Sequence, residues 1–186
     1  MTTRLTEVHS QLARSAVLMF GANDRMNQML IQHLHPAAWK AVPPGKVRGI
    51  AAIFTHMHNV RTKWIRLTAP HLTIPAQLHR VRCTQKQARA AFAESAARCT
   101  DMLAEALGSA DDRRIEKFRR DALAPAWPVG PEMLYYMLAH EAHHRGQVCM
   151  LAHQLGYTFS HAISDGIWNW EKLWKECGAS RGPGRT

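Results

Sequence analysis

Apolar residues recur every three or four positions in four long stretches of the chain, the spacing that places them on one face of an α-helix. The clearest stripe lies in the second stretch. It consists of Ile50, Ile53, Phe54, Met57, Val60 and Trp64. Proline and glycine separate the stretches, most plainly at Pro43-Pro44-Gly45. The pattern predicts helices over about residues 6–35, 47–67, 84–107 and 131–155.

Signals at the helix ends support these boundaries. The segment from Thr84 to Gln87 has the form of a capping box, which opens the third helix, and Gly108 follows its end. Pro131 stands at the start of the fourth helix and Gly156 just past its end, the usual asymmetry of helix termini.

Two shorter segments are also interpreted as helical. A charged stretch over residues 111–121 is expected to be a short exposed helix, and residues 165–176 a short terminal helix. The sequence therefore predicts an all-α domain over residues 1–176: a four-helix bundle with a short additional C-terminal helix. A long crossover is expected between the second and third or the third and fourth helices. Residues 177–186 are expected to form a disordered tail.

Composition and charge bear on the number of domains, the cellular location and the binding of nucleic acid. A chain of 186 residues with 46% apolar residues suits one domain that buries its own core. The four cysteines form no C-x-x-C pair, and no signal peptide is visible. No apolar run approaches the roughly 18 residues of a membrane span. We therefore expect a cytoplasmic protein. The net charge of +10 is spread along the chain, which favours a solvated basic surface over nucleic-acid binding.

The most informative chemistry lies in the fourth predicted helix, where three histidines fall within five residues. At about 100° per residue, His140 and His144 lie one turn apart on the core-facing side, whereas His143 points elsewhere. A pair with H-x-x-x-H spacing can bind one metal ion from a single helix. The alternative is a pair of core or interface histidines that are satisfied by hydrogen bonds. A third ligand has to come from another helix.

The best source of that ligand is the second predicted helix, which carries His56 and His58. They flank its apolar stripe on opposite sides, and either can reach inward. Four other histidines stand at helix ends or in loops, where a surface or interface role is the simpler explanation: His33, His35, His71 and His79.

Two segments together resemble the DinB-like superfamily of metal-binding four-helix bundles, which are not the DNA polymerases that share the name. They are His56-Met57-His58-Asn59-Val60-Arg61-Thr62-Lys63-Trp64 and His140-Glu141-Ala142-His143-His144-Arg145-Gly146-Gln147. The resemblance covers about residues 10–176. It implies that one histidine of the second helix and the pair of the fourth bind a divalent metal, which here are His56, His140 and His144. Members include thiol transferases that use low-molecular-weight thiols and a metal-dependent isomerase, and many have no known activity.

Three imidazoles leave an ion with an open coordination position, as in catalytic zinc sites. We therefore expect a metal-dependent enzyme of the thiol-transferase or hydrolase type, with Zn, Ni or Fe as the ion and a small molecule or low-molecular-weight thiol as the substrate. Glu141 is the candidate catalytic residue, as a general base or as a partner of a ligand; a surface acid is the alternative. A non-catalytic metal-binding stress-response protein is the second hypothesis.

The terminal segment suggests an oligomer. Trp168, Trp170 and Trp174 exceed what one short helix easily buries. We therefore expect a homodimer, with packing of the tryptophans on their own bundle as the alternative.

Overall fold

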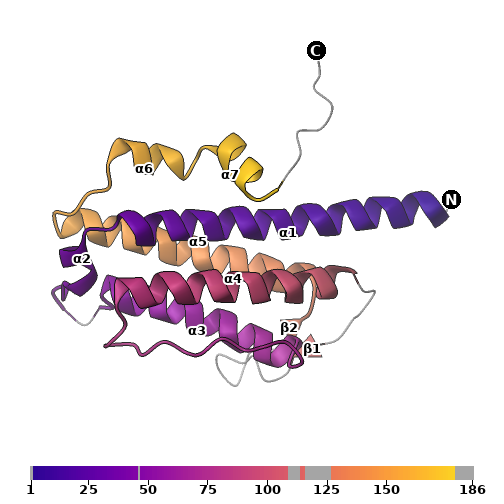
Figure 1. The fold of residues 1–186 in the computed structure, drawn as a ribbon, viewed down its shortest axis with the longest axis horizontal. Coiled ribbons are helices and arrows are strands. Elements are labelled where there is room, and N and C mark those ends of the chain that lie inside the picture. Colours follow the sequence, from indigo (N-terminus) through magenta and orange to yellow (C-terminus); the bar gives the residue numbers. More distant parts are fainter. Residues whose placement is uncertain (1, 46, 109–113, 116–126, 179–186) are drawn as a thin grey trace, which may run out of the picture.

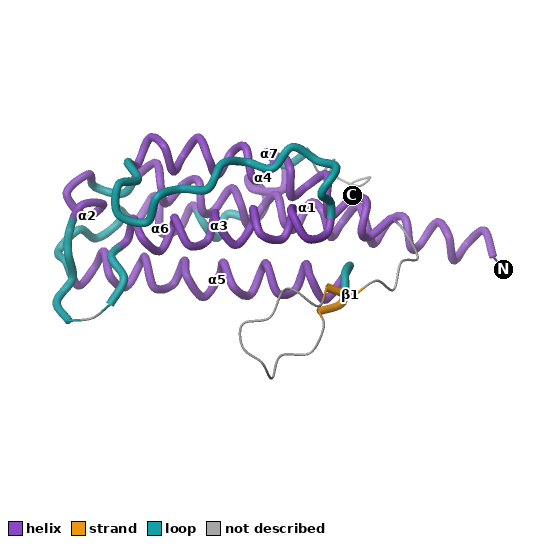
Figure 2. Tube along the Cα trace, turned by 90° about the horizontal axis from the view of Figure 1, so that it is seen from below, coloured by secondary structure: helices purple, strands orange, loops and turns teal. Residues whose placement is uncertain are grey.

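The computed structural model describes residues 2–45, 47–108, 114–115 and 127–178. Four long helices lie side by side and make up most of the molecule (Figure 1, Figure 2). They are α1 (Thr2–His33), α3 (Ile50–Thr68), α4 (Gln85–Gly108) and α5 (Pro131–Gln154). The predicted all-α four-helix bundle is confirmed.

The four helices form a closed ring of neighbours in the order α1, α4, α3, α5. Helices α1 and α5 run in one direction, and α3 and α4 run in the opposite one (Figure 1). Because α3 and α4 are parallel, residues 69–84 between them return along the length of the bundle. This segment is the long crossover that the breaker spacing predicted. It leaves α3 beside α5, which is the pairing on which the candidate site depends.

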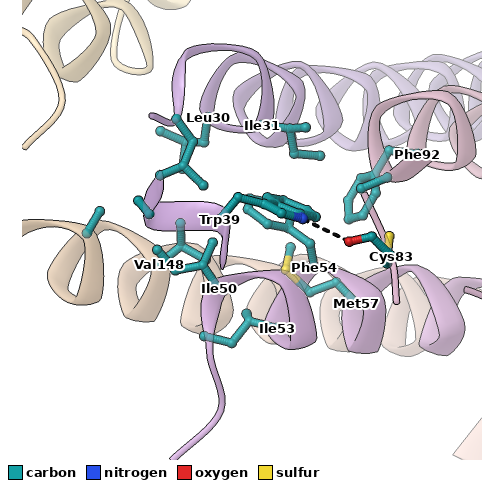
Figure 3. Close-up of a cluster of buried hydrophobic side chains, with 14 residues drawn as sticks. Leu30, Ile31, Trp39, Ile50, Ile53, Phe54, Met57, Cys83, Phe92 and Val148 are labelled. Atoms are coloured by element: carbon teal, nitrogen blue, oxygen red, sulfur yellow. Dashed lines mark hydrogen bonds between the residues drawn. The ribbon is translucent and has the colours of Figure 1, made fainter. Parts of the chain in front are cut away.

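The short helix α2 (Pro36–Lys40) closes one end of the bundle. Its Trp39 stacks on Phe54 at 5.7 Å between ring centroids, and Phe54 meets Phe92 of α4 edge to face (Figure 3). The indole Nε1 of Trp39 donates a hydrogen bond to the Cys83 carbonyl at 2.9 Å. A second apolar cluster around Trp64 and Met133 fills the other half of the bundle. The predicted stripe of the second helix is buried throughout, except for Val60, which is half-buried.

Local contacts explain where the helices begin and end. The Thr84 N–H donates to Gln87 Oε1 at 2.9 Å, and the Gln87 N–H donates to Thr84 Oγ1 at 3.2 Å, so the predicted capping box is confirmed. Gly130, with φ of 113°, turns the chain into α5, and Pro131 occupies the first turn.

The terminal segment differs from the prediction. Instead of one helix over residues 165–176, the chain forms α6 (His161–Gly166) and α7 (Trp170–Glu176). Asn169 interrupts them because its side chain accepts a hydrogen bond from the Lys172 N–H at 3.1 Å and so begins a new helix. Both short helices lie against α1, on the outside of the four-helix bundle (Figure 1).

Other predictions concern segments that are described only in part. Residues 114–115 of the expected charged helix form a short strand, β1 (Arg114–Ile115), antiparallel to β2 (Trp127–Pro128), so the helical prediction is wrong there. The rest of the stretch over residues 111–121 and all but Cys177 and Gly178 of the expected disordered tail lie outside the described residues. No helix in the described part of the chain is long and apolar enough to cross a membrane.

Candidate metal centre

Three histidines meet where α3 packs against α5. They are His56 of α3 and His140 and His144 of α5, and one ring nitrogen of each lies within 4.8 Å of the others. Nitrogens bound to one zinc ion at about 2.0–2.1 Å lie roughly 3–3.5 Å apart, and Nε2 of His56 and Nε2 of His140 are separated by 3.1 Å. The spacing and the all-imidazole donor set therefore fit a divalent ion of the first transition row.

Neighbouring side chains orient the two rings of α5. The Nδ1–H of His144 donates to Gln147 Oε1 at 2.7 Å. With the proton held on Nδ1, the lone pair of Nε2 is free to bind an ion, which is the arrangement expected of a metal-binding histidine. The ring of His140 stacks on Tyr136, one turn earlier in α5, at 5.5 Å between centroids and an angle of 11°. Tyr136 and the role of Gln147 were not foreseen from the sequence.

Burial favours the neutral, metal-binding form of His140 and His144. Loss of hydration, helped by the nearby rings of His144 and His56, lowers the pKa of His140 to about 3. Burial also lowers the pKa of His144. Protons therefore compete weakly with an ion for these two nitrogens at neutral pH.

The other two histidines near the candidate site have different surroundings. His58, two residues after His56, is fully buried on the opposite side of α3, where its Nε2–H donates to the Ala76 carbonyl at 2.9 Å and its Nδ1 lies 3.2 Å from Ser95 Oγ. It ties the crossover segment to the bundle. His143 is exposed, and its Nε2 contacts the amide of Gln147 at 3.0 Å. Neither belongs to the three-histidine group.

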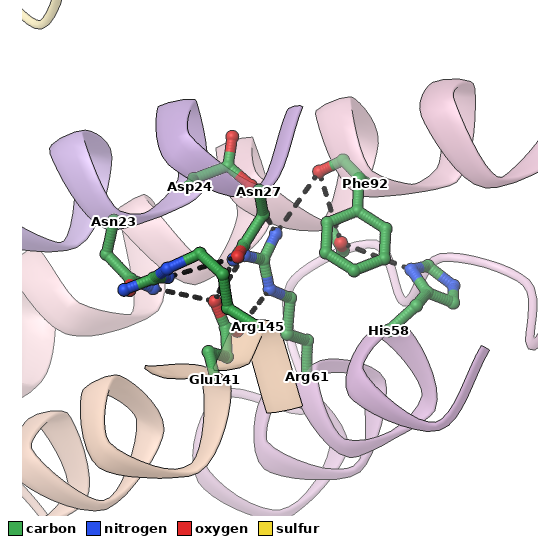
Figure 4. A network of polar contacts seen from close by, with 9 residues as sticks. Asn23, Asp24, Asn27, His58, Arg61, Phe92, Glu141 and Arg145 are labelled. Carbon is green, nitrogen blue, oxygen red and sulfur yellow. Dashed lines mark hydrogen bonds and ion pairs between the residues drawn. The ribbon is translucent and has the colours of Figure 1, made fainter. Parts of the chain in front are cut away.

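Glu141, beside His140 in the sequence, is buried, and both of its carboxylate oxygens accept hydrogen bonds (Figure 4). Arg61 of α3 donates from Nε to Glu141 Oε1 at 2.6 Å and from a terminal nitrogen to Oε2 at 2.8 Å. The side-chain amides of Asn23 and Asn27 of α1 each donate to Oε2 at 2.7 Å. The alternative of a surface acid is therefore wrong.

The network extends beyond Glu141. A terminal nitrogen of Arg61 donates to Asp24 at 2.7 Å, and the guanidinium lies over the ring of Phe92 at 4.6 Å from its centroid. Arg145 donates to the side-chain oxygens of Asn23 and Asn27 at 2.7 and 3.1 Å. Two cations and two carboxylates thus join α1, α3 and α5. Sequence reasoning left the role of Arg145 open and missed Asn23, Asp24, Asn27 and Arg61.

Fold and site together define a class of protein: an all-α bundle in which two neighbouring helices bring three imidazoles to one point. The family model described as DinB family matches residues 7–170. Because that range is most of the chain, the chain belongs to the DinB family, as the resemblance implied. No curated protein and no solved structure matches the chain.

Proposed function

We propose that the protein binds one divalent metal ion through His56, His140 and His144 and uses it as an enzyme of the thiol-transferase or hydrolase type. The observation that supports this proposal most directly is the convergence of three imidazoles with no fourth His, Cys, Asp or Glu ligand in the group, among the described residues. A site closed by four protein ligands serves structure, whereas a site with three keeps a position for water or substrate. Zn, Ni and Fe all suit this donor set.

The protein's own groups have separate roles in this proposal. The three histidines hold the ion, and Gln147 keeps His144 in the tautomer that binds it. When bound, the ion lowers the pKa of a coordinated thiol or water and so supplies a nucleophile at neutral pH. A direct catalytic role for Glu141 stays a prediction. The other expected role, as a partner of a metal ligand, also stays a prediction. The hydrogen bonds of Glu141 with Arg61 favour a third role, in which Glu141 holds α5, and with it His140, against α3.

A surface cavity of about 430 Å³ beside the histidines favours an enzyme over the non-catalytic alternative. Gln147 lines this cavity and also contacts His144. Because Gln147 joins the cavity to His144, we expect a small substrate held there to reach an ion bound by the three histidines. A protein that only stores or senses a metal has no need for such a space.

The test is catalysis by the metal-loaded protein. We expect zinc-loaded protein to accelerate the transfer of a low-molecular-weight thiol to a small electrophile, or the hydrolysis of an activated ester, by at least about 100-fold over the metal-stripped protein. Reaction rates of loaded, stripped and reloaded protein measure the effect. Equal rates for loaded and stripped protein across both reaction types would favour the non-catalytic metal-binding protein.

We also propose that two copies pair through the tryptophan surface formed by Trp168, Trp170 and Trp174, which are 68%, 47% and 38% exposed. Burial of these rings between two copies would remove apolar surface from water. Sedimentation at micromolar concentration should show about twice the 21.0 kDa of one chain. Trp168→Glu should shift the particle to one chain, and Tyr135→Glu, at an equally exposed ring on α5, should not. A single-chain particle in the unmodified protein would contradict the pairing.

A cytoplasmic location and a part in stress responses stay predictions from the sequence and the resemblance. Cell fractionation and measurement of protein abundance after oxidant or DNA-damaging treatment would test them. Nucleic-acid and membrane binding form no part of the proposal.

A further inference from the structure

The cavity that Gln147 lines combines mostly apolar walls with one arginine. One side is the segment that leads into α3, and the other is the second half of α5. Its walls are mostly apolar and consist of Val47, Ile53, Met150 and Leu151. The charged residue that lines it is Arg48, and none of the described lining residues is acidic. We call this space the Arg48 pocket.

Arg48 is available for a ligand. Its side chain is exposed, and within the described part of the chain it forms no ion pair or hydrogen bond with another residue. Arginines that bridge elements of a fold, such as Arg61, are instead buried between carboxylates. A guanidinium without a partner at the edge of an apolar pocket is suited to bind a carboxylate through two parallel hydrogen bonds.

The Arg48 pocket adjoins the candidate metal centre through Gln147. Gln147 lines the pocket and accepts the hydrogen bond from His144. A ligand that reaches from the histidines into the pocket therefore passes apolar side chains and has Arg48 within range of its far end.

We propose that the Arg48 pocket selects an anionic substrate, a small thiol that carries a carboxylate on a short aliphatic chain. The inference rests on the proposed function, because the thiol end occupies the open position at the metal. The carboxylate binds the Arg48 guanidinium, and the methylene groups contact the apolar walls. Arg48 is thus a specificity-determining residue that takes no part in holding the ion. The proposal involves binding alone and requires no oxidant or reductant.

The experiment compares two thiols of the same length on cobalt-loaded protein. 3-Mercaptopropionate carries a carboxylate, and 3-mercapto-1-propanol carries a neutral hydroxyl in its place. Thiolate binding to Co(II) is followed by its near-ultraviolet charge-transfer absorption, which gives an affinity without any assay of turnover. We expect the carboxylate thiol to bind about tenfold more tightly, since a charge-assisted pair contributes roughly that much.

Variants assign the preference to Arg48. Arg48→Gln should remove the preference while cobalt content stays the same, and Arg48→Lys should restore part of it because the charge remains but the planar fork is lost. Arg89→Gln is the matched control, because it removes the same charge from an exposed position on α4. It should leave the preference intact.

Each contrary result has a definite meaning. Equal binding of the two thiols by the unmodified protein would overturn the role of Arg48 and leave the proposed metal-dependent function standing. A preference that survives in Arg48→Gln would also overturn it, since the carboxylate would then bind the ion or another group. Stoichiometric cobalt with no charge-transfer band from either thiol would reject the thiol-transferase form of the proposed function, and this inference with it.

Discussion

Replacing His144 with alanine is expected to leave the purified protein with little bound metal. The loss should exceed about 100-fold in affinity, since even the partners that orient metal ligands are worth about 10–100-fold. The ring of His144 is close to both other rings of the group, with centroids 4.8 Å from His56 and 4.5 Å from His140. Without it, two imidazoles remain and the ion is under-coordinated. Elemental analysis and competition with a chelator measure the change, and His140→Ala and His56→Ala should behave alike.

The matched control for that experiment is His143→Ala. It removes an imidazole from the adjacent position. His143 contacts the amide nitrogen of Gln147 and the edge of the His144 ring, but it does not belong to the three-histidine group. Metal content should therefore change little. If His143→Ala empties the site while His140→Ala or His144→Ala leaves it full, the assignment of the ligands is wrong. Normal circular dichroism of each variant would separate loss of metal from loss of fold.

The second large effect is expected in stability. Arg61→Met should lower the free energy of unfolding by about 3–5 kcal/mol, the usual cost of leaving a buried charge without its partner. The Arg61 side chain is 1% exposed and holds Glu141 and Asp24, which are 2% and 14% exposed. Methionine fills similar space but removes the ion-pair partner of both carboxylates. Urea unfolding monitored by circular dichroism gives the change, provided that the denaturant slope stays constant.

Two comparisons make this prediction specific. Arg25→Ala breaks the ion pair between Arg25 and Glu176, two side chains that are each about one third exposed. It should lower the free energy of unfolding by no more than about 1 kcal/mol. Adding Glu141→Gln to Arg61→Met should recover part of the lost stability because the unpaired negative charge is removed. An Arg61→Met protein as stable as Arg25→Ala would show that the network contributes little to the fold.

The helices and their boundaries could be predicted from the sequence because they depend on short-range interactions. Apolar spacing, Pro131 and the reciprocal bonds of Thr84 and Gln87 all act within a few residues of one another. The same register placed His140 and His144 on one face of α5, where the structure has them. The terminal helix was predicted less well, since a single asparagine cap at Asn169 outweighed the continuity of the pattern.

The buried ion pair of Glu141 and Arg61 could have been predicted from the sequence. Glu141 falls in the apolar stripe of α5 between Met137 and His144, and Arg61 falls in the stripe of α3 between Met57 and Trp64. Opposite charges on the buried faces of two helices indicate a buried ion pair, because neither is stable there alone.

The sequence by itself determined which segments form helices and which faces of those helices are apolar, since both follow from residues near one another in the chain. Only the tertiary structure decided which residues meet. His56 and His58 flank the same stripe, and periodicity could not choose between them. Packing of α3 between α5 and α4 directs the first to the three-histidine group and the second to Ser95. Likewise the donors to Glu141 come from 80 to 118 positions away. Such contacts depend on how whole helices pack, which no local pattern contains.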